Sequence, residues 1–278
     1  MGANKNKSEN KSFIKANIVY SVDTGEKVIN ETLGQGNMSR IVVGTFKKHL
    51  VSITDGRHLR HKLNNEITGF EFLDHETKVS DFYDVDEVKS MYYQEVNSLI
   101  IELTGAKKVV IFDHTLRSGD KVTRNTKKLR EPVFSAHNDY TEWSGPQRVR
   151  EIMPTEETEK LLKKRFSIIQ VWRPINGPIK TNPLAICDAR STEEKDFIKS
   201  ERRYPNRIGQ TYRLLYNPNH KWFYFPNMKQ DEILVFKVYD SSRDGRARFT
   251  PHTSFEDPNT PAGSPPRESI EVRALAFY

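Results

Sequence analysis

The sequence predicts a mainly β protein with flanking helices, arranged as a β-sandwich or a jelly-roll barrel. The second half of the chain contains about eight short strand-like runs with turn residues between them, and helical segments precede these runs. Apolar runs such as VVIF and ILVF would also suit a parallel sheet. However, no helical segments separate the later strands, which argues against a parallel arrangement.

The first half combines strands with one long helix. Apolar residues recur at helical spacing from Val85 to Leu99, Asp84 or Asp86 can cap the first turn, and Gly105 would end the helix. The segment that follows the next strand is polar and basic and is interpreted as a loop. The expected elements are strands at 12–21 and 40–57, a helix at 84–101, a strand at 107–117, a loop at 118–131 and a short strand at 133–140.

The second half begins with a helix that ends near Lys164 and Arg165 and continues as strands. Two strand-like runs, 207–218 and 220–228, meet at the turn sequence NPNH (217–220), and this spacing predicts that they pair as a hairpin. His220, in that turn, is expected to be solvated. Other strands are expected at 167–173, 183–190, 231–241, 249–255 and 269–278.

Length and charge limit the possible classes of protein. We expect residues 1–12 to form a mobile tail and residues 13–278 to form a single domain, whose first third supports a barrel core at about 107–278. The net charge is +7, but the basic residues are scattered along the chain. This scatter argues against nucleic acid as a partner and leaves an acidic small molecule open.

A cytoplasmic location without a membrane partner is expected. No apolar run approaches the roughly 18 residues that a membrane helix needs, and the N-terminus MGANKNKSENKS has no apolar segment typical of a signal peptide. Cys187 is the single cysteine, which excludes an intrachain disulfide and fits a reducing compartment. It is interpreted as a buried apolar thiol. The sequence gives no indication of the oligomeric state.

One histidine of the eight has a carboxylate two residues later: His137, with Asp139. In a strand, residues i and i+2 point to the same face, so both side chains would enter one cavity. One further histidine would complete the facial triad of two histidines and one carboxylate that holds non-haem Fe(II). His252 is the candidate, with His220 and His114 as rival third ligands. The alternative interpretation of the pair is that Asn138-Asp139 lies in a surface turn.

Arg267 and Ser269 follow His252 in the sequence PPRESIEV. An Arg-x-Ser pair on a strand places a forked guanidinium and a hydroxyl on one face, which suits the distal carboxylate of 2-oxoglutarate. The alternative is an exposed arginine paired with Glu268 or Glu271. We therefore expect Fe(II), 2-oxoglutarate and O2 as cofactor and cosubstrates, with ascorbate as a supporting reductant in vitro.

The ordered set His137, Asp139, His252, Arg267 and Ser269 resembles the 2-oxoglutarate-dependent dioxygenases. The segments SAHNDYT, IIQVWRPINGPIKTNPLAICDAR, YDSSRDGRARFTPHTSFEDP and PPRESIEVRALAFY resemble the CmcJ/NvfI-like branch of specialised-metabolism oxidoreductases, over roughly residues 107–278. The resemblance implies a double-stranded β-helix core of the cupin-like type. It also implies oxidation of a C–H bond in a small-molecule metabolite by hydroxylation, desaturation or oxidative cyclisation, with release of succinate and CO2.

Other residues are candidates by position. Gln170 stands where many members of the branch have asparagine, and it is a candidate for contact with the cosubstrate, as is Arg173. Trp172 and Arg173 alternate on one expected strand, so only one of them can face the pocket directly. The candidates for the substrate pocket are Tyr140, Trp143, Trp172 and Arg117.

Two other function classes remain possible at this point. One is a non-haem iron oxidase that takes no 2-oxoglutarate and uses Arg-x-Ser to bind a substrate carboxylate. The other is a non-catalytic β-barrel module that binds an anionic ligand. A binding module has no chemical reason to combine all five residues in this order.

Overall fold

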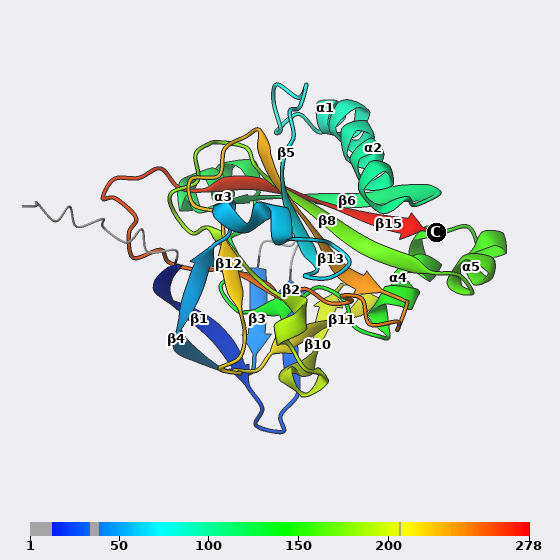
Figure 1. Cartoon of the computed structure of the whole chain (residues 1–278), viewed down its shortest axis with the longest axis horizontal. Helices are drawn as coiled ribbons and strands as arrows, with labels where there is room; N and C mark the ends of the chain where they lie inside the picture. Colours follow the sequence, from blue (N-terminus) through cyan, green and yellow to red (C-terminus); the bar gives the residue numbers. More distant parts are fainter. Residues whose placement is uncertain (1–12, 34–38, 206) are drawn as a thin grey trace, which may run out of the picture.

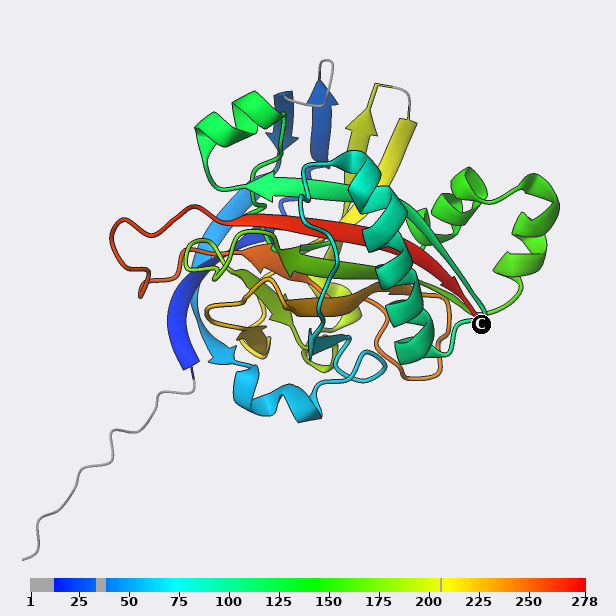
Figure 2. The ribbon, with the colours of Figure 1, turned by 90° about the horizontal axis from the view of Figure 1, so that it is seen from above.

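The computed structural model describes residues 13–33, 39–205 and 207–278. Their strands form two sheets that pack face to face, with helices on the outer face of the smaller sheet (Figures 1 and 2). This is the mainly β arrangement with flanking helices that the sequence predicts, and its core is a double-stranded β-helix. The tail expected at 1–12 lies outside the described residues.

The larger sheet has ten strands within the described chain, and most of its neighbouring strands are antiparallel. Isolated bridges join Val19 to Ser135 and Ser21 to Leu215, so the sheet curls until its first strand meets its middle. In spatial order the strands are β1 (Phe13–Val22), β4 (Thr45–Asp55), β12 (Trp222–Tyr224), β9 (Leu184–Cys187), β14 (His252–Ser254), β7 (His137–Asn138), β11 (Arg207–Leu214), β10 (Phe197–Tyr204), β2 (Val28–Leu33) and β3 (Ser39–Val43).

The smaller sheet is antiparallel throughout. Its strands, in spatial order, are β5 (Phe70–Asp74), β13 (Glu232–Asp240), β8 (Phe166–Pro174), β15 (Glu268–Phe277) and β6 (Lys108–Ser118). The helical elements of the described chain are η2 (Arg57–Lys62), α1 (Val85–Glu87), η3 (Val88–Tyr92), α2 (Tyr93–Thr104), α3 (Lys121–Lys127), α4 (Ser144–Ile152), α5 (Thr155–Leu162), η4 (Ala189–Ser191) and η5 (Glu194–Asp196). None of these helices is long and apolar enough to cross a membrane.

Side chains alternate across β8, and both faces of this strand are buried. Ile168 and Trp172 enter the core between the sheets, whereas Ile169 and Val171 enter a second core beneath α2. Figure 2 shows α2 lying across the outer face of the sheet. Each fully buried apolar side chain of this size contributes about 1.5–3 kcal/mol. The continuous apolar runs in the sequence therefore reflect a sheet covered on both sides.

The helix expected at 84–101 is confirmed, with the ends that the sequence indicates. Asp84 caps the first turn by accepting from the N–H groups of Asp86 and Glu87. Gly105 ends α2 in the left-handed conformation with φ of 69°. A π-helical turn, η3, interrupts the helix between these ends.

Three expectations about local structure were wrong. The segment 118–131 is not only loop, because Asp120 caps the short helix α3 by accepting from Thr123 N–H. The strand expected at 40–57 divides into β3 and β4 at Gly44, which has a positive φ of 145°. The expected strand at 133–140 is reduced to β7, whose two residues are bounded by irregular backbone.

The hairpin expected between 207–218 and 220–228 was also wrong. β11 pairs with β10, and β12 pairs with β4 and β9. The turn between them is held by Asp196, whose carboxylate accepts from Asn217 Nδ2 at 3.1 Å and lies 3.1 Å from His220 Nε2. His220 is therefore buried rather than solvated, and the chain leaves one part of the sheet for another at this point.

Cys187 is fully buried in β9, as expected for an apolar thiol. Burial raises the pKa of the thiol to about 12. Because the thiolate is the reactive form, we expect Ellman's reagent at pH 8 to label the folded protein about 1000-fold more slowly than the urea-unfolded chain. Rapid stoichiometric labelling of the folded protein would contradict this burial, and the single cysteine makes the readout unambiguous.

Candidate active site

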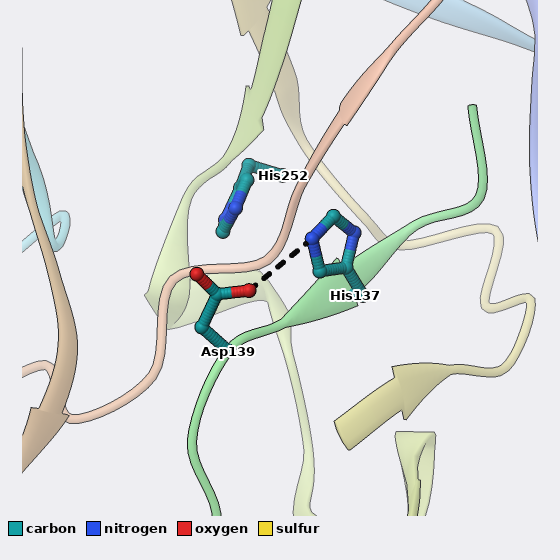
Figure 3. A group of neighbouring side chains, drawn as sticks. All are labelled: His137, Asp139 and His252. Carbon is teal, nitrogen blue, oxygen red and sulfur yellow. Dashed lines mark ion pairs between the residues drawn. The ribbon is translucent and has the colours of Figure 1, made fainter. Parts of the chain in front are cut away.

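Three candidate metal ligands meet where two short strands pair. His137 opens β7, His252 opens β14, and the two residues lie opposite each other in the antiparallel ladder. Asp139 follows β7, and its Oδ1 lies 3.4 Å from His137 Nε2 (Figure 3). One possible ligand atom from each residue lies within 4.8 Å of the other two, so the three side chains can hold one metal ion.

The backbone determines which nitrogen of each histidine faces the others. His137 Nδ1 donates to the Ser135 carbonyl at 2.8 Å, and His252 Nδ1 donates to the Thr250 carbonyl at 3.1 Å. A carbonyl oxygen only accepts, so each Nε2 keeps a lone pair for a metal. Burial, followed by the charge of His137, lowers the pKa of His252 to about 4. His252 is therefore neutral at physiological pH, the form that binds metals.

Two donors hold the outer oxygen of Asp139. Gln170 Nε2 and Arg273 Nε both donate to Oδ2, the latter at 3.3 Å, while Oδ1 faces His137. Burial alone would raise the pKa of Asp139, but its contact with His137 and the charge of Arg273 outweigh burial and hold this pKa well below its usual range. Asp139 is therefore a carboxylate with one oxygen available to a metal.

Asn138, between two of the candidate ligands, is buried and joins three segments. Its Nδ2 donates to the carbonyls of Tyr140 and Val238 at 2.7 and 2.8 Å, and its Oδ1 accepts from the Thr250 N–H at 3.1 Å. The side-chain amide thus makes bonds that a longer strand would make through its backbone. It also ties β7 to Thr250, whose carbonyl orients His252.

Thr250 also contacts Gly69, which lies just before β5. Thr250 Oγ1 donates to the Gly69 carbonyl at 3.1 Å. Gly69 has a positive φ of 92°, and a Cβ atom there would collide with the Thr250 hydroxyl. Glycine is therefore required for this close approach behind His252.

Arg267 lies just before β15 and is 2% exposed. Its Nη1 donates to the Asn182 carbonyl and to Ser254 Oγ, both at 2.6 Å, and its guanidinium lies 5.5 Å from the Trp172 ring centre. Among the residues described, no carboxylate forms an ion pair with it. Burial, followed by the like charge of Arg117, lowers its pKa to about 9. A buried cation of this kind is stabilised by an anionic ligand.

Unpartnered polar atoms near Arg267 indicate where such a ligand would bind. Arg267 Nε and Ser269 Oγ are buried and have no hydrogen-bond partner within the described chain. Arg267 lines a small cavity together with His137, Asp139, His252, Trp172 and Glu271. The donor set therefore fits Fe(II) at one end of this cavity and the distal carboxylate of 2-oxoglutarate at the other.

A larger cavity of about 490 Å³ opens onto His137 and Asp139. This volume is typical of small-molecule sites. Three of the residues expected in the substrate pocket line it: Tyr140, Trp143 and Arg117. Trp143 is 51% exposed and stands at the rim, whereas Arg117 also borders the small cavity and joins the two.

Trp172 and Arg173 lie on opposite faces of β8, and only Trp172 faces the small cavity. The guanidinium of Arg173 turns toward the helices, where its Nε donates to Tyr92 Oη at 3.0 Å and its other nitrogens bond to the Gln230 carbonyl and His75. The expectation that Arg173 contacts the cosubstrate is therefore corrected, because strand alternation directs it away from the site. Gln170 faces inward and contacts Asp139.

Sequence reasoning missed Arg273, and the alternative that Arg267 is exposed and pairs with Glu271 is wrong. Glu271 does not pair with Arg267: it pairs with Arg117 at 2.8 Å and with Arg273, and Arg273 reaches Asp139. Burial would raise the pKa of Glu271, but the charges of Arg117 and Arg273 lower it to about 2. Strand alternation from Arg267 could have identified both residues, since every second position shares its face.

Comparison with known proteins was consistent with this geometry. Residues 16–277 match the family model described as "Oxidoreductase/YMDC permease-like domain". The chain is 32% identical to the hydroxylase/desaturase efuI of Hormonema carpetanum, over 88% of this chain and 92% of the relative. It is 30% identical to the Fe(II)/2-oxoglutarate-dependent dioxygenase nvfI of Aspergillus novofumigatus, over 82% of this chain and 83% of that protein.

A solved structure has the same fold. The iron and alpha-ketoglutarate-dependent endoperoxidase NvfI superposes with a TM-score of 0.82 at 25% identity, covering 96% of this chain and 98% of that structure. Two further curated relatives are named alpha-ketoglutarate-dependent dioxygenases, and that of Talaromyces stipitatus is 31% identical over 87% of this chain and 90% of its own length.

The contact between Gln170 and Asp139 predicts a role in metal affinity. We expect Gln170→Met, which keeps the side-chain volume but removes the donor, to weaken Fe(II) binding about 10–100-fold. Anaerobic titration calorimetry measures this affinity. Gln147→Met is the matched control, because Gln147 lines the larger cavity and, among the described residues, makes no hydrogen bond to a candidate ligand. Equal affinity in wild type and Gln170→Met would show that Arg273 alone positions the carboxylate.

Proposed function

The chain belongs to the oxidoreductase family whose model it matches, in the CmcJ/NvfI-like branch of Fe(II)- and 2-oxoglutarate-dependent dioxygenases, and we propose which of its residues carry out each part of that reaction. The enzyme oxidises a C–H bond of a small specialised metabolite and releases succinate and CO2. Fe(II), 2-oxoglutarate and O2 are its cofactor and cosubstrates.

We propose that His137, Asp139 and His252 hold the iron. The supporting observation is that their ligand atoms gather within 4.8 Å in a cavity shared with Arg267. When bound, the iron supplies the site at which O2 oxidises the substrate, at the expense of 2-oxoglutarate. The chain's contribution is to keep His252 neutral and Asp139 ionised, which are the forms of these two side chains that bind a metal.

Arg267 anchors the distal carboxylate of 2-oxoglutarate in this proposal, with Ser269 as a further donor. The unpartnered Nε and Oγ atoms of these two residues support the assignment. An anion there would compensate a cation whose pKa is lowered to about 9 by burial. Trp172 stacks beside Arg267 and restricts the entry of water to this end of the cavity.

The substrate occupies the larger cavity, between the ligand pair and the rim at Trp143. Tyr140 and Arg117 form part of its wall, and these substrate roles rest on position alone. A cytoplasmic location and a single domain stay predictions from the sequence. The relatives favour neither of the two rival classes, which were an oxidase without 2-oxoglutarate and a non-catalytic module.

Succinate formation tests these assignments. Purified wild-type protein with Fe(II), ascorbate, O2 and 2-oxoglutarate should form succinate slowly without substrate. His137→Ala should abolish both iron binding and succinate formation, because it removes a ligand.

Arg267→Ala should keep iron but raise the 2-oxoglutarate concentration needed for half-maximal rate by about 10–100-fold, since a charged hydrogen-bond partner is lost.

Matched controls are available for both variants. His58 and Arg150 are exposed and lie outside the two cavities, so His58→Ala and Arg150→Ala should behave as wild type. If Arg267→Ala left the 2-oxoglutarate requirement unchanged, the cosubstrate anchor would have to be another residue. If wild type neither bound iron nor consumed 2-oxoglutarate with a broad metabolite mixture present, the proposed roles would be wrong.

A further inference from the structure

The larger cavity has an excess of positive charge in its wall. Seven arginines line it, against four carboxylates, a difference of three positive charges. The arginines are Arg117, Arg130, Arg148, Arg202, Arg207, Arg213 and Arg273, and the carboxylates are Asp113, Glu131, Asp139 and Glu151. Such an excess is costly in a partly enclosed site unless a ligand compensates it.

Most of these arginines already have partners on the protein. Arg273 and Arg117 pair with Glu271, and Arg273 also pairs with Asp113. Arg148 pairs with Glu151 at 2.9 Å, and Arg207 pairs with the same carboxylate at 3.2 Å. Arg213 donates to Ser135 Oγ at 2.7 Å. These side chains are held in place by the protein itself.

Arg130 and Arg202 differ, because neither forms an ion pair with a carboxylate of the described residues. Arg202 donates to the amide oxygen of Asn30 and lies 5.1 Å from the Tyr204 ring centre. Arg130, half-buried between α3 and β7, has no side-chain hydrogen bond within the described chain. Burial and then the like charges of Arg117 and Arg202 lower the pKa of Arg130.

The register of β10 directs Arg202 and Tyr204 into the larger cavity. Arg202 and Tyr204 are separated by two positions on β10, so they share a face, while Glu201 and Arg203 pair with each other on the opposite face. Arg202 lies opposite Gly209 of β11, which has no side chain to cover it. Burial would raise the pKa of Tyr204, but Arg202 and Arg207 lower it. The cluster of Arg130, Arg202 and Tyr204 thus contains two guanidinium groups that no carboxylate of the described residues neutralises.

We propose that Arg130, Arg202 and Tyr204 bind an anionic group of the substrate, a carboxylate or a phosphate, and so select acidic metabolites. This inference rests on the proposed function, because it places the substrate in the cavity that the candidate iron ligands border. Two guanidinium groups and a phenol match the oxygens of either anion. The anion is distinct from 2-oxoglutarate, whose distal carboxylate binds at Arg267 in the small cavity.

Binding of small aromatic probes tests the proposal on the full chain. The protein is loaded with Fe(II) and saturating 2-oxoglutarate under anaerobic conditions, so that the cosubstrate site is filled and no turnover occurs. Benzoate, phenyl phosphate and the neutral benzamide are then compared by titration calorimetry. We expect at least one anion to bind about tenfold or more tightly than benzamide, and the stronger anion identifies carboxylate or phosphate as the preferred group.

The double variant Arg130→Gln with Arg202→Gln should lose this preference, and Arg150→Gln, which changes an exposed arginine outside the cavity, should retain it. The single variant Arg130→Gln should raise the melting temperature of the ligand-free protein, because it removes repulsion between like charges. The same measurement on the double variant, with a melting temperature close to that of wild type, shows that its loss of binding is not a loss of folding.

Three results would overturn the proposal: equal binding of benzamide and both anions to wild type, an anion preference that survives in the double variant, or anions that bind only by displacing 2-oxoglutarate. The comparison requires no turnover. Absence of iron-dependent succinate formation would therefore count against the proposed function alone, whereas loss of charge selectivity alone would count against this cluster.

Discussion

The pairing of His137 with His252 across β7 and β14 is the constraint on which the site depends. Only a few residues make this ladder, so the register is held mainly by side chains and loops. Asn138 contributes most, because its amide bonds to the backbone of β13, of Tyr140 and of Thr250. A shift of one residue in either strand would turn its histidine to the other face of the sheet, away from the partner histidine. The positions of the two histidines therefore depend on how the two sheets pack against each other, and the buried core around Trp172 holds the sheets together.

Charge is distributed along β15 by strand alternation. Arg267 and Glu271 line the small cavity and Arg273 lines the larger one, while Ile270 and Val272 pack beneath α2. Glu271 lies between the two arginines and takes up the charge of Arg273 and of Arg117. Arg267 is left without a carboxylate, although it is buried at least as deeply. The protein thus neutralises Arg273, which contacts Asp139, and leaves positive charge at Arg267, the proposed anchor for 2-oxoglutarate.

Much of this could be predicted from the sequence. The period of two in SAHND identified His137 and Asp139, which both line the small cavity, because alternation is a local property of a strand. Arg267 of PPRESIEV lines the same cavity. Long-range pairing was harder: nothing within 207–228 shows that β11 joins β10 while β12 joins β4, since Asp196 lies outside both runs. The contact between Gln170 and Asp139 was also hidden, because it depends on how two sheets stack rather than on spacing in either segment.

The contact between Gly69 and Thr250 links parts of the chain that are 181 residues apart. The loop before β5 closes against the segment that carries His252, and the fit depends on the absence of a side chain at Gly69. The loop before β5 and the segment that carries His252 therefore have to be kept together for this contact behind the candidate metal site to be preserved. A chimaera with a related dioxygenase that exchanged only the C-terminal half would join a loop and a strand shaped for different partners, so the exchange has to include both.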